Sequence, residues 1–513
     1  MATPSYTTDL SAQVISECES NATPLVFTNL GTGSDATETD YFIQKTACVS
    51  KPFNITAGGI YCTTSQAITS SQLFWAWYYF GCPNKLLGET SGGLQALVGQ
   101  SGTAHDKWDV LGSDTYTYGG WRCIPVDFLN VGYDDRTGAG AGTSQFLVFG
   151  VYCNTSGGIG KGNPLGIDVM RYGRGEARIN GGETGNYATF TGFATENDDL
   201  NNRWGLIQAV DGGYLQQGLV ILGYASAVDF RDSNKYIVIA NTKKVLSSFN
   251  RWEVRQAGSR VDWTNISISS LGTVARGEFE CIDNADINFD SCVFTDMSTF
   301  VFQSASTILN TTFRRCGVVT QGGAVFTNCI FDNSREVKAI LVNSISNLSN
   351  CFFISSGTGY AIEGFGTAGD YTISDVTFTN YASGNGTSGN EAIHVLASSG
   401  IVNINIDGGT TPSIHTEGAT VNVIIPEVIL TLTGLQVESD ISIITSGTTT
   451  ERTNVQENPG TTYPYNYSYA IGDYVDIGVF KAGYVPFYIR NYLLGNTSSS
   501  LPISQVIDRA YLV

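Results

Sequence analysis

The chain has 513 residues, which is enough for two to four domains. Its 46 acidic residues outnumber its 27 basic ones and give a net charge of −19, so we expect no binding to nucleic acid or to an anionic membrane surface. A hydrophobic content of 42% argues against a disordered chain. No apolar run of about 18 residues occurs, and no transmembrane helix is expected.

The first residues, Met1–Tyr6, lack a basic segment followed by an apolar core, so no secretion signal is expected and synthesis in the cytoplasm is predicted. The 11 cysteines are odd in number, irregularly spaced and without a C-x-x-C pair. This pattern predicts buried, reduced thiols rather than a disulfide framework or a zinc site.

Residues 1–185 are expected to form an N-terminal β-rich domain. They contain a dense aromatic run at 74–80 and further strand candidates at 121–126 and 146–152. Alternating strands with long loops need a second sheet to bury their apolar faces, which favours a β-sandwich. The aromatic run is either core or a platform for stacking sugars. Alternation places about half of its rings in the core of any sandwich, so packing is preferred.

Residues 186–445 are expected to form stacked coils. The segment begins with short apolar runs at 187–190, 204–207, 219–222, 228–230 and 236–239. From Trp263 a motif of the form apolar–x–Asn–small/apolar–x–apolar recurs, with Asp or Ser as variants of the Asn. Its copies span 263–268, 289–294, 308–313, 326–331, 348–353, 373–378 and 401–406, and a weaker one ends at 422–425.

A constant strand motif at variable intervals is typical of a parallel β-helix, in which each coil returns to one strand position while its loops vary. The Asn would turn a corner in the left-handed region and place its amide on that of the next coil. Cys292, Cys329 and Cys351 would then share an inward ladder. The final apolar residues Phe294, Phe313, Phe331, Phe353 and Phe378 would form a second, buried ladder. Antiparallel hairpins with coincidental Asn residues are the alternative.

Residues 446–513 are expected to hold a linker and a small C-terminal β-sandwich. Residues 446–464 are rich in Thr, Asn and Pro, and 474–480 and 487–492 alternate like antiparallel strands. Tyrosine is frequent from Tyr463 onward. Its ring packs while its hydroxyl stays hydrated, so this domain is predicted to cap the coils or contact a neighbouring chain.

The coil segment of the sequence resembles a known protein family. The coils resemble the pectate-lyase-like parallel β-helix of bacteriophage tailspikes and related virion proteins, over about residues 160–430. Five segments resemble uncharacterised phage structural proteins: 162–176, 202–205, 228–233, 295–298 and 314–317.

The resemblance implies an all-β fold, with a right-handed parallel β-helix between the N-terminal and C-terminal domains. It also implies a virion component, such as a tail spike, a tail fibre or a capsid-surface decoration, assembled in the host cytoplasm. The implied partners are two sister chains in a homotrimer, other virion proteins and, where the particle recognises its host through this chain, host surface polysaccharide.

Polysaccharide cleavage on such coils needs paired carboxylates. The candidate catalytic residues are Glu278, Glu280, Asp283, Asp286 and Asp290, which Asp332 and Asp375 would join from other coils. The preferred interpretation is that acids at coil corners form turns and solvate the surface. A lyase would need a base and a cation. Arg314–Arg315 is the one basic pair on the clear coils, and a surface ion pair is preferred for it.

No cofactor or metal site is expected. His105, His394 and His415 are far apart in sequence and form no zinc motif, the acids at 134–135 and 197–199 match no calcium motif, and 156–162 lacks the phosphate-loop pattern. The leading hypothesis is therefore a non-catalytic virion structural protein. A virion-associated glycan depolymerase, either hydrolase or lyase, is the main alternative, and a free carbohydrate-active enzyme is a third.

Overall fold

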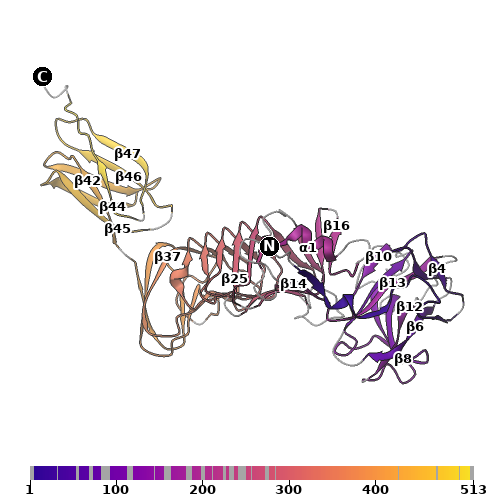
Figure 1. The fold of residues 1–513 in the computed structure, drawn as a ribbon. Coiled ribbons are helices and arrows are strands. Elements are labelled where there is room, and N and C mark those ends of the chain that lie inside the picture. The colour runs from indigo at the N-terminus through magenta and orange to yellow at the C-terminus, as the bar shows by residue number, and fades with distance from the viewer. Residues whose placement is uncertain are drawn as a thin grey trace. The chain divides into compact units, whose positions relative to one another are not determined.

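The chain is built almost entirely of strands, with one α-helix, α1 (Phe190–Asn197), in its described part (Figure 1). No described helix is long and apolar enough to cross a membrane. The computed structural model describes residues 5–508 except 32, 54–56, 69–72, 82–92, 112–119, 144, 155–162, 181–187, 198–202, 211, 223–226, 230–235, 241–249, 256, 272–276, 283–284, 387, 426, 470–471 and 496. The chain divides into two compact units, Met1–Ala324 and Val325–Val513.

The first unit begins with two antiparallel six-stranded sheets that enclose one core. One sheet contains β10 (Gly120–Cys123), β7 (Leu73–Phe80), β13 (Asn163–Gly173), β5 (Cys48–Phe53) and β4 (Ala36–Glu38), with β2 (Val14–Ser16) paired to β13. The other contains β11 (Asp135–Thr137), β9 (Ala104–Leu111), β8 (Gly93–Ser101), β12 (Phe146–Asn154), β6 (Ala57–Ile68) and β3 (Phe27–Leu30). The β-rich N-terminal region predicted from the sequence is thus two facing sheets.

The aromatic strand β7 is buried on both faces rather than on one. Phe74 and Tyr78 point into the core between the sheets. Trp75 and Trp77, on the opposite face, are each only 1% exposed, and Trp77 Nε1 donates to the Arg203 carbonyl oxygen at 2.6 Å. The chain that follows the sheets covers this second face, so the run is core and not a sugar-stacking platform.

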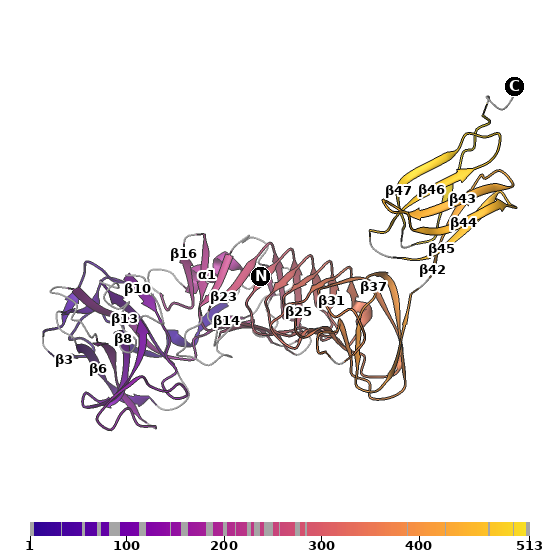
Figure 2. The ribbon, with the colours of Figure 1, turned by 180° about the vertical axis from the view of Figure 1, so that it is seen from behind.

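Two parallel runs of strands follow in the first unit (Figures 1 and 2). After β1 (Ser5–Thr8), which is antiparallel to it, one run contains β14 (Glu176–Asn180), β18 (Leu219–Leu222), β21 (Arg251–Val254), β24 (Glu278–Cys281), β27 (Phe300–Val301) and β30 (Val319–Thr320). The other contains β15 (Ala188–Thr189), β16 (Ile207–Val210), β17 (Gly213–Gln216), β19 (Ala227–Asp229), β20 (Tyr236–Ala240), β22 (Arg260–Thr264), β23 (Ser267–Leu271), β25 (Asp286–Asp290), β26 (Val293–Thr295), β28 (Thr307–Leu309) and β29 (Thr312–Arg314). Within this run β16 and β17 pair antiparallel.

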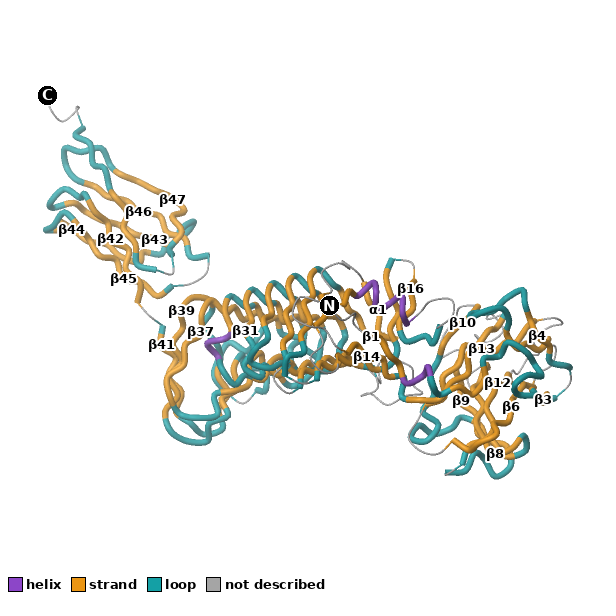
Figure 3. The backbone as a smooth tube through the Cα atoms, viewed as in Figure 1, coloured by secondary structure: helices purple, strands orange, loops and turns teal. Residues whose placement is uncertain are grey.

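The second unit repeats this arrangement, and the smooth tube of Figure 3 follows its turns. One parallel run contains β33 (Lys338–Leu341), β36 (Tyr360–Gly364), β38 (Ile393–Val395) and β40 (Ile414–Thr416). The other contains β31 (Val325–Thr327), β32 (Ile330–Asp332), β34 (Leu348–Ser349), β35 (Phe352–Ile354), β37 (Gly369–Thr379), β39 (Ile401–Gly409) and β41 (Thr420–Ile424). Each unit therefore contains coils stacked through large parallel sheets.

The predicted corners are confirmed in the first six copies of the motif. The third residue of the first six motif copies has a positive φ of 48° to 57°, at Asn265, Ser291, Asn310, Asn328, Asn350 and Asp375. This left-handed turn reverses the usual alternation, so the next residue also points inward. Cys292, Cys329 and Cys351 occupy that position and are fully buried. Asn350 Nδ2 donates to Asn328 Oδ1 at 2.5 Å, which forms part of the expected amide ladder.

The phenylalanine ladder is observed within each unit. Phe294 stacks on Phe313 in the first unit, with ring centroids 5.5 Å apart. In the second unit Phe331 stacks on Phe353 at 4.6 Å, and Phe353 stacks on Phe378 at 5.7 Å. Four of these rings are at most 2% exposed, whereas Phe378 is half-buried rather than buried as predicted.

The register of the last two motif copies was predicted wrongly. Ile406 pairs with Ile373 and not with Phe378, because the strand has no corner at Asn403 and turns only at Gly408, near its end. Asn403 is a ladder residue rather than a corner: its amide donates to Asp370 Oδ1 at 2.7 Å and accepts from Asn422 at 2.9 Å.

Among the earlier runs, 219–222 and 236–239 are strands as predicted. Residues 187–190 are not one strand, since α1 begins at Phe190. At 204–207 a strand starts only with Ile207. Residues 187 and 230, at the ends of two predicted runs, lie outside the described residues.

The C-terminal region of the second unit consists of a three-stranded and a four-stranded sheet that share a core. The strands are β42 (Glu427–Thr433), β45 (Thr462–Ser468) and β48 (Ser499–Pro502) in one sheet, and β44 (Glu451–Asn458), β43 (Ser439–Thr445), β46 (Tyr474–Phe480) and β47 (Phe487–Leu493) in the other. Strands β42 and β43 precede the boundary predicted at 445/446, yet Leu430 and Ile443 are in this core. The segment predicted as a linker holds β44 and the start of β45.

The ten cysteines that the structure describes are all buried, as predicted, and no two of them are joined by a disulfide. Cys82 lies outside the described residues. Cys292 Sγ lies 3.6 Å from the Trp263 carbonyl oxygen, and burial raises the pKa of its thiol to about 11. At neutral pH this thiol is therefore protonated and acts as a small hydrophobic group.

Candidate functional site: a histidine and glutamate cluster on the coils

The predicted acidic segment does not form one site. Glu278 and Glu280 lie on β24, where they alternate with the buried residues Phe279 and Cys281. Glu280 is paired with Arg251 of the preceding coil at 3.1 Å. Burial raises the pKa of Glu278, partly opposed by the charge of Arg251. These two carboxylates therefore belong to a charged ladder on the outer face of one sheet.

The other acids of the segment lie on a different sheet or outside the described residues. Asp286 and Asp290 are on β25, while Asp283 is not among the residues described. Burial raises the pKa of Asp286. Asp290 accepts from Asn310 Nδ2 at 2.9 Å and from the neighbouring Ser291 hydroxyl at the same distance, which is a corner function.

The remaining candidates also have structural contacts. Asp332 accepts from the Asn333 amide at 2.6 Å, and Asp375 is itself a corner with φ 52°. Arg315 Nη2 lies 2.7 Å from Asp296 Oδ2 at the surface, so the preferred ion-pair interpretation is confirmed for this arginine.

A cluster of titratable groups that the sequence did not predict lies on the outer face of β36, β38 and β40. The parallel register places Glu363 beside His394, and His394 beside His415. His394 Nδ1 lies 3.0 Å from Glu363 Oε2, and its Nε2 lies 2.8 Å from Glu417 Oε1. His415 Nε2 is 3.9 Å from the same Glu417 oxygen. Two of the chain's three histidines therefore meet at one carboxylate.

The inner side of this cluster is held rigidly. Glu363 is 8% exposed and is also bonded to Lys338 Nζ from the preceding coil. Burial by itself would raise the pKa of Glu363, but the hydrogen bonds from Lys338 and His394 outweigh it and leave the pKa lowered. The Tyr360 ring stacks on His394 with centroids 4.5 Å apart. These contacts fix the plane of the His394 imidazole.

The outer side of the cluster is open. The His394 side chain is 11% exposed, that of His415 is 17% exposed and that of Glu417 is 52% exposed. His415 Nδ1 lies 2.9 Å from the Gly386 carbonyl oxygen, and the fully buried Glu391 lies behind it at 3.8 Å. Glu417 can therefore approach both imidazoles from the solvent side.

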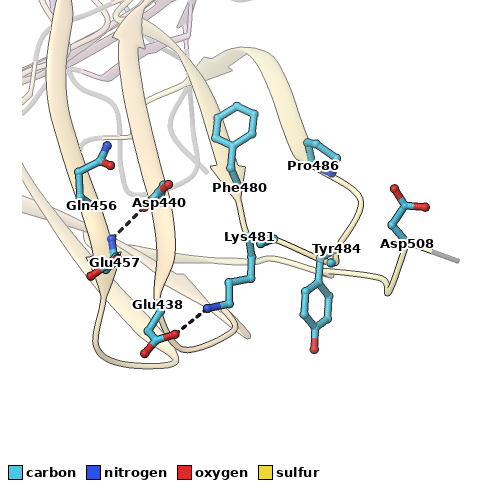
Figure 4. Close-up of a pocket in the computed structure, with 11 residues that line it drawn as sticks. Glu438, Asp440, Gln456, Glu457, Phe480, Lys481, Tyr484, Pro486 and Asp508 are labelled. Atoms are coloured by element: carbon cyan, nitrogen blue, oxygen red, sulfur yellow. Dashed lines mark hydrogen bonds and ion pairs between the residues drawn. The ribbon is translucent and has the colours of Figure 1, made fainter. Parts of the chain in front are cut away.

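A hollow of about 480 Å³ lies in the C-terminal sheets (Figure 4). Two of its carboxylates already have partners within the chain: Glu438 Oε2 pairs with Lys481 Nζ at 2.9 Å, and Asp440 Oδ1 accepts from the Glu457 backbone N–H at 2.9 Å. These contacts join the ends of neighbouring strands, so we assign the hollow no binding role.

Comparisons with known proteins give distant structural neighbours, among them the following three. No protein-family model matches the chain, and no curated protein matches it. A structure titled "Structural basis for the promiscuous specificity of the carbohydrate-binding modules from the beta-sandwich super family" matches at a TM-score of 0.18 and 10% identity, over 31% of this chain and 63% of that one.

Two catalytic domains match over 80% of this chain. The Agl-KA catalytic domain is covered completely, at a TM-score of 0.15 and 10% identity. The catalytic unit of the GH87 α-1,3-glucanase from Streptomyces thermodiastaticus strain HF3-3 is covered to 96%, at 0.17 and 11% identity. All three TM-scores are below 0.5, so the function is argued from the residues of this chain.

Proposed function

We propose that this chain is a non-catalytic structural protein of a bacteriophage particle. It is a tail spike, a tail fibre or a capsid-surface decoration, built around a right-handed parallel β-helix that forms a rigid projection. The observation that carries the proposal is the repeated register of the parallel sheets, in which each coil pairs with the next through the same strand positions.

Repeated register supports a mechanical function. Each coil is joined to its neighbour by backbone hydrogen bonds on more than one side, and stacked aromatic rings fill the interior. Bending such a stack would break many hydrogen bonds together and separate close-packed rings. The coils within each unit are therefore suited to bear mechanical load.

The surface of the coils also fits a structural protein. Glu280 of β24 forms an ion pair with Arg251, and Asp290 of β25 accepts a corner hydrogen bond from Asn310, as is usual for acids on a structural surface. A homotrimer with contacts to other virion proteins would cover the remaining flanks of the coils.

Purified particles test this proposal. Density-gradient fractions of the phage are analysed by quantitative peptide mass spectrometry. The chain should co-purify with the capsid and tail proteins at a fixed copy number per particle, divisible by three. Recovery of the chain only in the soluble lysate, with none in the particle fractions, would contradict a virion role.

A glycan depolymerase is the second candidate, and the cluster at His394 favours it. Glu363 and Glu417 lie at opposite nitrogens of one imidazole, so their carboxyl groups fall within the roughly 5–10 Å that glycoside hydrolases use. The lowered pKa of Glu363 suits a base rather than an acid.

Incubation with host surface polysaccharide separates the two candidates. A structural protein releases no reducing ends. A depolymerase releases them, loses that activity in Glu363→Gln and Glu417→Gln, and keeps it in Glu427→Gln, which alters an exposed acid at the start of β42.

A further inference from the structure

We propose that His394, His415 and Glu417 bind one divalent transition-metal ion, of which zinc is the best fit. The ligand atoms are Nε2 of each histidine and the Glu417 carboxylate. The ion would cross-link two adjacent coils, because His394 on β38 is the direct neighbour of His415 on β40. One possible ligand atom from each of these three residues lies within 4.8 Å of the other two.

The hydrogen bonds at the other ring nitrogens prepare both histidines as ligands. His415 Nδ1 faces the Gly386 carbonyl oxygen at 2.9 Å, and a carbonyl can only accept. His394 Nδ1 faces the Glu363 carboxylate at 3.0 Å, which also accepts. Each Nδ1 therefore carries the proton, and in the neutral imidazole the lone pair is on Nε2. Carboxylate or carbonyl partners of this kind are the usual support of zinc-binding histidines.

The position of Glu417 is explained by a shared cation. Its Oε1 atom lies 2.8 Å from His394 Nε2 and 3.9 Å from His415 Nε2. A carboxylate oxygen and an imidazole lone pair repel at such a distance unless a proton or a metal lies between them. Zinc bonds of about 2.0–2.2 Å place tetrahedral ligand atoms about 3.3 Å apart, a value between these two distances.

The charge of the cluster also calls for a cation. The carboxylates of Glu363, Glu391 and Glu417 contact the two imidazoles, while Lys338 supplies one positive charge. Neutral imidazoles leave two negative charges without a partner of opposite sign among these groups. Two nitrogen ligands favour zinc or a neighbouring transition metal over calcium or magnesium, which prefer oxygen.

Three protein ligands leave the fourth position of a tetrahedral ion facing solvent, on the side where Glu417 is exposed. Water would take that position, and a carboxylate or hydroxyl of another molecule would be able to replace it. The site is thus a coil cross-link with one exchangeable position.

The test uses the full-length protein, stripped with a chelator and then titrated with Co²⁺ and Zn²⁺. One equivalent should bind, and the Co²⁺ form should show the intense visible bands of a tetrahedral site with nitrogen ligands. Zn²⁺ should also raise the unfolding temperature, because it binds only the folded chain.

Variants locate the ion. Glu417→Gln and His415→Gln should reduce the bound metal from one equivalent to none, and Glu363→Gln should weaken binding about 10- to 100-fold through the lost support of His394. The matched control Glu427→Gln should bind like the parent. Since Glu417 is exposed, its variant should keep the folded circular-dichroism spectrum. Absence of binding at micromolar metal, or equal binding by Glu417→Gln, would overturn the proposal.

Discussion

Single residues at the coil corners hold a strained backbone that most side chains avoid. Asn350 has φ 50° and donates to Asn328 on the preceding coil. Asn350→Ala should lower the free energy of unfolding by about 1–2 kcal/mol, because alanine is strained in the left-handed region and makes no ladder hydrogen bond. Asn350→Gly should cost less, since glycine adopts this region freely. Urea unfolding of the three proteins measures the difference, and an equal cost for both variants would argue against backbone strain.

A buried carboxyl group in the N-terminal sheets should make stability depend on pH. Asp168 is fully buried and accepts from the backbone N–H groups of Ile43, Gln44 and Val169. Burial raises the pKa of Asp168 to about 8, because the effect of burial is larger than the opposite effect of these hydrogen bonds. The unfolded carboxyl titrates near about 3.9. The contribution of the neutral Asp168 carboxyl to the free energy of unfolding is therefore fully present below about pH 4 and is lost as the pH rises towards 8.

Urea midpoints at pH 5 and pH 8 test this account. The parent should lose stability between the two values, and Asp168→Asn should lose distinctly less because its side chain does not ionise. Asp407→Asn, which alters an exposed acid, should follow the parent. The same pH dependence in Asp168→Asn and the parent would show that another group is responsible.

At the scale of the elements, inward and outward positions of one short strand should differ sharply. Phe353 is fully buried between Phe331 and Phe378, whereas the adjacent Phe352 is 40% exposed. Phe353→Ala should cost about 3–5 kcal/mol by leaving a cavity in the stack. Phe352→Ala, the matched control, should cost well under half of that. Comparable losses in chemical denaturation would contradict the coil register.

The sequence could predict the coils because their corners are local. A position with left-handed backbone between two short strands favours Asn, Asp or Ser, and it turns the next side chain inward. The corner residue Asn328 and the buried Cys329 can therefore be recognised together in one short segment of the sequence. The prediction was wrong at 401–406 because Asn also serves in straight ladders. Asn403 is a residue of such a straight ladder, and the corner of this coil lies at Gly408.

The histidine cluster could not be predicted by the same reasoning. His394 and His415 are neighbours only because strands β38 and β40 pair in register, and the loop between them follows no repeat. The sequence did offer one signal: each histidine is the middle residue of a β-branched triplet that forms a strand, Ile393–Val395 and Ile414–Thr416. Aligning those triplets as consecutive coils would have placed the two rings side by side.

For the whole molecule, we expect three copies of the chain to form a homotrimer. Tyr474 and Tyr488 in the C-terminal sheets are 44% and 49% exposed, which leaves them free to contact a sister chain or another virion protein. Because β42 and β43 belong to these sheets, a truncation that removes the whole C-terminal domain ends at Ile425 and not at the boundary predicted at 445/446. Light scattering should give three chains for the full-length protein and a lower mass for the truncated one. A full-length monomer would reject self-association.

A structural role in a phage particle can be tested by locating the chain on intact virions. Gold-labelled antibodies raised against residues 427–508 are imaged by electron microscopy on purified particles. Label is expected at regular positions on the tail or the capsid surface of most particles, and none on particles of a phage in which the gene is deleted. Particles that carry no label above that deletion background, while the same antibodies detect the chain in the lysate, would contradict it.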